Sequence, residues 1–175
     1  LVPFCWLPDD GLQRKEELDR VPYLAWRAAG CLDTTPGRAV SKLQVALKLA
    51  QLAEHFDIQS VAFDRWRIED FKALAADNGV ELPPMEPFGQ GYQSMSPALE
   101  AMETHLLNGT VEHPAHPILT WCAANAVVVS DAAENRKLSK DKATGRIDLM
   151  VAAVMGAGLV SKQKTEERTV EIIVL

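Results

Sequence analysis

Two aspartates stand where the sequence pattern predicts the ends of buried elements. Asp64 follows an apolar, β-branched run at 58–63, so it lies at the carboxyl end of a predicted strand, where open α/β sheets place ligands and catalytic groups. Asp148 lies early in a predicted apolar helix at 144–157, beside the inward-facing Ile147. Carboxylates that converge from a strand end and a packed helix are the oxygen ligands that Mg²⁺ or Mn²⁺ requires for phosphoryl chemistry.

Each aspartate also has a purely structural interpretation. Asp64 suits the N-cap or first turn of the helix predicted to follow it, because its carboxylate would accept hydrogen bonds from free backbone N–H groups. Asp148 suits the start of its own helix, where a negative charge complements the helix dipole. The physics of the sequence leaves both interpretations open.

A basic segment at 136–146 contrasts with the acidic character of the chain. The protein has a formal net charge of -6 and a pI near 5.2, so its surface as a whole does not attract DNA or anionic lipid. Within the segment Asp141 is the single acid, and the cationic side chains are Arg136, Lys137, Lys140, Lys142 and Arg146. Such a segment is either a solvated hairpin or a local guide for nucleic-acid phosphates.

Other catalytic patterns are missing or incomplete. No GxxxxGK[ST] occurs, which excludes a P-loop within this sequence, and the Gly-Gln-Gly at 89–91 is an incomplete dinucleotide fingerprint. No GxSxG surrounds Ser94 or Ser96, so a serine hydrolase is not expected. His113 and His116 flank prolines in a turn and lack the ligand spacing of a zinc site.

Length and composition predict one globular domain. The chain has 175 residues, of which 47% are hydrophobic and 24% charged, as in ordinary folded domains. No apolar run approaches the length of a membrane span and the first residues lack a signal-peptide pattern, so we expect a soluble, untargeted protein. Three widely spaced cysteines predict free, buried thiols in a reducing cytoplasm: Cys5, Cys31 and Cys122.

The elements that must position the two aspartates alternate between strand and helix. Strands are predicted at 1–8, 31–35, 58–63, 85–88 and 126–130, and helices at 22–29, 41–56, from 68 to the Asn78-Gly79 turn, 118–124 and 144–157. Ser96 and Pro97 predict the N-cap and first residue of a helix that ends near 107. The apolar end at 170–175 suits an edge strand or a docking segment. This β-α-β-α rhythm predicts an α/β fold.

Four motifs occur in a familiar order. They are AFDRW at 62–66, FGQGYQSMSP at 88–97, Asn125 with VVV at 127–129, and RID at 146–148 followed by VA at 151–152. The chain thereby resembles the C-terminal nuclease domain of tailed-phage terminase large subunits, from about Phe4 to about Gly158. The GQGYxSMSP block is specific to one branch of that family.

The resemblance implies a ribonuclease-H-like fold, with a mixed central sheet flanked by helices. It also implies that the protein cuts double-stranded DNA with the help of two Mg²⁺ or Mn²⁺ ions. Asp64 matches the strand-end acid of the family and Asp148 its late-helix acid, while the basic segment is expected to contact backbone phosphates. A third acid belongs to the first strand of the domain, upstream of Leu1. We therefore expect residues 1–160 to be an N-terminally incomplete nuclease domain, weak or inactive alone, and 161–175 to be a tail.

The implied role is cutting of concatemeric phage or prophage DNA at packaging initiation and termination, in the cytoplasm of an infected or lysogenic bacterium. The implied partners are double-stranded DNA, the terminase small subunit, the portal of the procapsid and an upstream ATPase domain, with no membrane. A non-catalytic module of the same fold, with Asp64 and Asp148 as helix caps, is the alternative, and it predicts no metal site. A Holliday-junction resolvase would share the carboxylates but would not explain the GQGY block.

Overall fold

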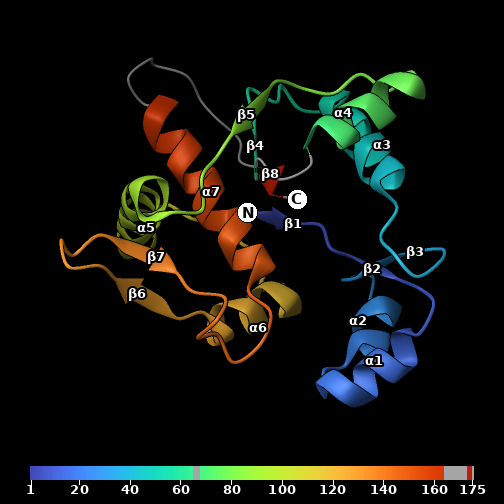
Figure 1. Ribbon diagram of the computed structural model, residues 1–175, viewed down its shortest axis with the longest axis horizontal. Coiled ribbons are helices and arrows are strands. Elements are labelled where there is room, and N and C mark those ends of the chain that lie inside the picture. Colours follow the sequence, from blue (N-terminus) through green and yellow to red (C-terminus); the bar gives the residue numbers. More distant parts are fainter. Residues whose placement is uncertain (65–67, 164–172, 175) are drawn as a thin grey trace.

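Short strands alternate with longer helices along the chain (Figure 1). The computed structural model describes residues 1–64, 68–163 and 173–174. The strands are β1 (Val2–Pro3), β2 (Trp6–Pro8), β3 (Asp33–Thr35), β4 (Val61–Phe63), β5 (Met85–Pro87), β6 (Val128–Ser130), β7 (Arg136–Leu138) and β8 (Ile173–Val174). The helices are α1 (Leu12–Asp19), α2 (Tyr23–Ala28), α3 (Lys42–Ala53), α4 (Ile68–Asp77), α5 (Tyr92–Leu107), α6 (Pro117–Asn125) and α7 (Asp148–Gln163).

The strands pair two by two. β2 pairs with β3, β4 with β5, and β1 with β8, all in parallel, whereas β6 and β7 form an antiparallel hairpin. Parallel pairs joined through helices confirm the predicted α/β class. Within the described residues, however, these pairs remain four separate two-stranded ladders, so the expected central sheet is present only in pieces.

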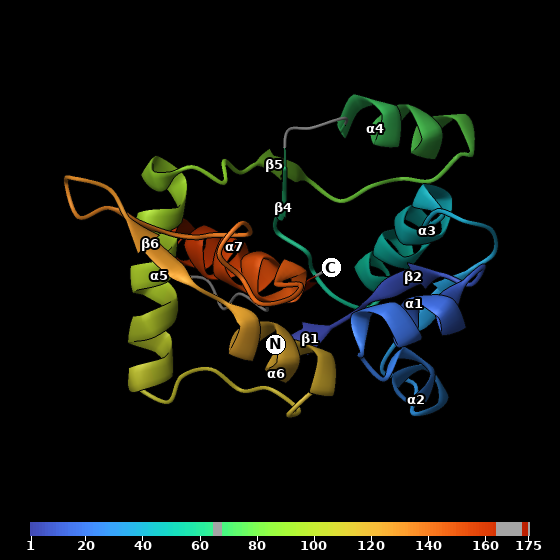
Figure 2. The ribbon, with the colours of Figure 1, turned by 60° about the horizontal axis from the view of Figure 1, so that its bottom comes forward.

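The core centres on α7, which crosses the middle of the molecule (Figure 1). Val151 and Val154 pack with α5 residues such as Met95 and Leu99, and Figure 2 shows α5 crossing α7. On the other flank, Leu149 joins a second cluster formed with α1, α2 and α6. Both apolar clusters therefore meet on one helix, whose first residue is the candidate ligand Asp148.

Helix α5 begins earlier than the sequence predicts. It starts at Tyr92 with Gly91 as its N-cap, which places Pro97 inside the helix. Proline removes one helical hydrogen bond, and Pro97 lies on the exposed side of the second turn. The predicted cap, Ser96, has a different partner: its Oγ accepts a hydrogen bond from the backbone N–H of Arg136 at 3.1 Å.

Three further expectations compare directly with the structure. The cysteines are free thiols, but only Cys122 is buried, while Cys5 and Cys31 are half-buried. Of the apolar end at 170–175, Ile173–Val174 forms β8, and the other residues lie outside the described part of the chain. Among the helices of the described residues, none combines the length and apolarity needed to cross a bilayer.

Candidate functional site

Asp64 is positioned by the parallel β4–β5 pair. The register places Val61 opposite Met85 and Phe63 opposite Pro87, and the ladder continues when the Phe88 N–H donates to the Phe63 carbonyl at 2.8 Å. Both strands therefore end at the same edge, where Asp64 follows β4 directly and the turn at 89–91 follows β5. Asp64 is exposed at this edge, and β4, which was expected to be a buried strand, is half-buried.

The turn after β5 brings a hydrogen-bond donor to this carboxylate. Nε2 of Gln90 donates to Oδ2 of Asp64 at 3.0 Å. Sequence reasoning missed this contact of Gln90, because it considered the motif at 89–91 only as a dinucleotide fingerprint and as part of a family motif. Gln90 could have been predicted to lie near Asp64 if β4 and β5 had been expected to pair in parallel, because the residues that follow the two strands then lie at the same edge.

Asp148 is the first residue of α7 and points to solvent. Its neighbours Ile147 and Leu149 are both buried, with 2% and 6% exposure, and this anchoring turns the Asp148 side chain outward, where 68% of it is exposed. Its charge is favourable at the positive end of the helix dipole. The ammonium of Lys140 lies 3.8 Å from Oδ1 of Asp148, so the loop after the hairpin supplies a cation beside the carboxylate.

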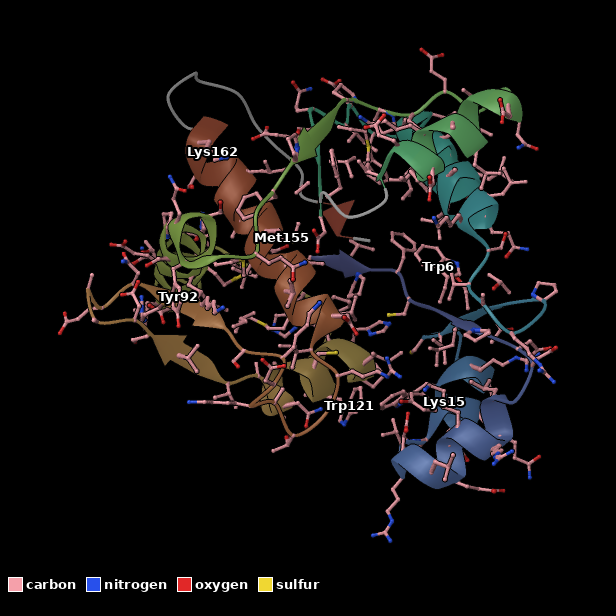
Figure 3. The ribbon with its side chains drawn as sticks, viewed as in Figure 1. Trp6, Lys15, Tyr92, Trp121, Met155 and Lys162 are labelled. Carbon is pink, nitrogen blue, oxygen red and sulfur yellow. The ribbon has the colours of Figure 1, made fainter. Side chains whose placement is uncertain are left out.

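The β6–β7 hairpin, which carries the first part of the basic segment, is attached to α5. Both terminal nitrogens of Arg136 donate to the Glu103 carboxylate at 2.8 Å, a two-point contact that raises the pKa of the guanidinium. Nζ of Lys137 lies 4.7 Å from the centre of the Tyr92 ring, at the start of α5 (Figure 3). The hairpin is thus held against the same helix that the Gln90 turn leads into.

The remaining cations of the basic segment have different surroundings. Lys142 is exposed in the loop between β7 and α7. Arg146 and Asp148 line a cavity of about 230 Å³ whose other walls include Tyr23 of α2 and Trp121 of α6. Burial, together with the hydrogen bond that its hydroxyl donates to Asp19, raises the pKa of Tyr23 to about 12, so the phenol stays neutral.

The donors present agree with the implied divalent ions in kind. Asp64 and Asp148 offer carboxylate oxygens, and Mg²⁺ is commonly held by one or two carboxylates together with water and substrate phosphates. The two carboxylates contact separate partners, Gln90 and Lys140. No three His, Cys, Asp or Glu side chains gather into a possible metal site within the described ranges. A bound ion would therefore need ligands beyond these side chains.

Comparison with known proteins identifies the class. The profile of the terminase large subunit, endonuclease domain, matches residues 1–164. The chain belongs to this family, and the resemblance drawn from the four motifs is confirmed.

Individual relatives agree with this assignment. The chain is 49% identical to the terminase large subunit of Enterobacteria phage HK97, over 95% of this chain and 33% of that protein. It is 28% identical to Protein YmfN of Escherichia coli K12, over 54% of this chain and 25% of the relative. The crystal structure of the HK97 bacteriophage large terminase superimposes with a TM-score of 0.82 at 49% identity, covering 88% of this chain and 32% of that one. The chain thus spans a third or less of the length of these relatives.

Proposed function

We propose that this chain is the DNA-cutting part of a terminase large subunit and acts as a metal-dependent endonuclease on concatemeric double-stranded DNA at packaging initiation and termination. The observation that carries the proposal is the membership in the endonuclease-domain family. Two exposed carboxylates support it: Asp64 at a strand end, and Asp148 at a helix start beside Lys140 of the basic segment. Exposure matters because a phosphodiester in duplex DNA must reach these oxygens from outside.

Asp64 and Asp148 are the proposed metal ligands and catalytic carboxylates. When bound, two Mg²⁺ or Mn²⁺ ions supply an activated water and charge stabilisation at the leaving oxygen. The chain itself would contribute two carboxylates whose backbone positions are set by the β4–β5 edge for Asp64 and by the buried neighbours Ile147 and Leu149 for Asp148. The ribonuclease-H-like arrangement is part of this proposal.

The basic segment is the proposed contact with backbone phosphates. Lys137, Lys140 and Lys142 are the proposed phosphate contacts, and they lie along the hairpin and the loop that leads to Asp148. Arg136 supports the proposed phosphate contact indirectly, because its ion pair with Glu103 holds the hairpin on α5. Arg146 is a further proposed contact, and it lines the same cavity as Asp148. Phosphate contacts position a duplex without reading its sequence.

The partners and place of action follow from the family. A terminase large subunit would work with the terminase small subunit, the portal of the procapsid and an ATPase domain of the same protein. The site of action would be the cytoplasm of the infected or lysogenic bacterial host. These assignments rest on family membership. The domain limits of 1–160 for the nuclease and 161–175 for a tail are likewise proposed, although α7 continues to Gln163 and the family match to residue 164.

Plasmid cleavage tests the proposal. The purified chain is incubated with supercoiled plasmid and either Mn²⁺ or Mg²⁺, beside EDTA and the variants Asp64→Asn and Asp148→Asn. We expect weak cutting that requires the ion and falls further in each variant, because each substitution removes a charged ligand. Asp77→Asn, an exposed acid at the end of α4, is the matched control and should cut like the wild type.

Two outcomes would contradict the proposal. Cleavage that persists unchanged in Asp64→Asn would remove this carboxylate from the chemistry. Absence of metal-dependent cleavage, both by this chain and by a longer terminase large subunit that contains it, would favour the non-catalytic module, in which both acids are helix caps.

A further inference from the structure

Gln90 is tied to Asp64 by the geometry of two neighbouring strands. The hydrogen bond from Nε2 of Gln90 to Oδ2 of Asp64 measures 3.0 Å and joins residues that are 26 positions apart in the sequence. It exists because β4 and β5 are parallel and in register, so that both carboxyl ends open on the same edge. A hydrogen bond of this kind restricts the rotation of the carboxylate and occupies one of its oxygens.

The turn that carries Gln90 is held on both sides. Before it, Phe88 is only 2% exposed, and its ring packs so closely on α7 that a Cβ placed on Gly158 would lie 2.8 Å from Cζ of Phe88. After it, Gly91 forms the N-cap of α5. Within it, a Cβ on Gly89 would lie 3.1 Å from Oγ of Ser94, so the turn is compact. Gln90 therefore extends from a rigid support.

We propose that Gln90 is a positioning residue that orients the Asp64 carboxylate for a divalent ion through its hydrogen bond to Oδ2. This inference rests on the proposed function, because it assigns a role to Gln90 within the same site. Groups that orient a metal-binding carboxylate through a hydrogen bond typically change metal affinity or activity by about 10- to 100-fold when removed. Gln90 itself touches neither the ion nor the DNA in this role.

Binding of Mn²⁺ to the chain, in the presence of a short phosphorothioate duplex that resists cutting, tests the inference. The variant is Gln90→Met, which keeps the length of the side chain and removes the N–H donor. Gln93→Met is the matched control, because Gln93 is an exposed glutamine in the first turn of α5, three residues along. Bound Mn²⁺ is measured by electron paramagnetic resonance, and plasmid cleavage and thermal unfolding are measured on the same samples.

We expect Gln90→Met to weaken Mn²⁺ binding by about 10-fold or more and to lower kcat with little change in the KM for DNA, while the unfolding temperature matches that of Gln93→Met. Wild-type Mn²⁺ affinity in Gln90→Met, with binding abolished in Asp64→Asn, would overturn this role and leave the proposed function standing. Wild-type Mn²⁺ binding and cleavage in Asp64→Asn would overturn both, as would failure of the wild-type chain to bind Mn²⁺.

Discussion

His116 is the N-cap residue of α6, and its Nδ1 is buried without a hydrogen-bond partner in the described part of the chain. Burial lowers the pKa of this imidazole, although a hydrogen bond with the backbone of Cys31 opposes the shift. A histidine whose pKa is lower in the folded state binds its proton more readily when unfolded. The folded protein therefore loses stability as the pH falls through the unfolded pKa of about 6.5, and regains it as the pH rises.

We expect the free energy of unfolding to fall more steeply between about pH 7 and 5 in the wild type than in His116→Gln. The difference should be a fraction of the roughly 1.4 kcal/mol per pH unit that one whole proton contributes, because the ring is only partly buried. Urea unfolding at several pH values measures it, with His55→Gln, an exposed histidine after α3, as the control. Parallel curves for wild type and His116→Gln would contradict the prediction.

Single residues were predictable where local pattern decides their place. An acid after an apolar run, such as Asp64, and an acid before a buried helical face, such as Asp148, both occupy the predicted ends of elements. Gln90 and Glu103 were not predictable, because their partners lie 26 and 33 positions away and depend on strand register and helix packing. Hydrophobic periodicity carries no information about such long-range polar contacts.

Elements were predicted better than their ends. The order of strands and helices follows the alternating hydrophobic pattern, but the Ser96-Pro97 pair does not start a helix as predicted. The Ser-Pro pair satisfies the local rule for an N-cap. Tertiary packing overrides this rule, because Met95 is buried in the core and the turn that contains it is part of α5. The sheet was predicted as one unit, whereas short strands of two or three residues pair only locally in the described chain.

The crossing of α5 and α7 depends on a glycine. A Cβ at Gly158 would lie 2.8 Å from both the Ala98 Cβ and Cζ of Phe88, and neither atom is the end of a flexible side chain. We expect Gly158→Val to lower the free energy of unfolding by about 1–3 kcal/mol, because an overpacked helix crossing must separate. Chemical denaturation measures this change.

A double-mutant cycle with Phe88→Leu identifies the cause. The smaller side chain leaves room for the added valine, so the two substitutions together should cost clearly less than the sum of their separate effects. Additive effects would mean that valine at 158 acts through some other neighbour than the Phe88 ring.

Across the whole molecule, positive charge is concentrated in one segment. The chain carries a net charge of -6, yet residues 136–146 collect five cations, of which Lys140 lies 3.8 Å from Asp148. A uniformly acidic surface would repel DNA, so the DNA contact that we propose would use this local segment. Composition revealed the segment, whereas its attachment to α5 through Glu103 and Tyr92 required the three-dimensional structure.

This charge distribution predicts the salt dependence of DNA binding. Replacement of Lys137, Lys140 and Lys142 by alanine should weaken duplex binding and reduce the slope of log K against log salt by roughly one unit for each phosphate that is no longer neutralised. Replacing Lys42, Lys48 and Lys72, which lie on α3 and α4, removes the same charge elsewhere and serves as the control. A slope that falls equally in both triple variants would mean that overall charge governs binding, whereas a fall confined to the first would assign the phosphate contacts to the hairpin and its loop.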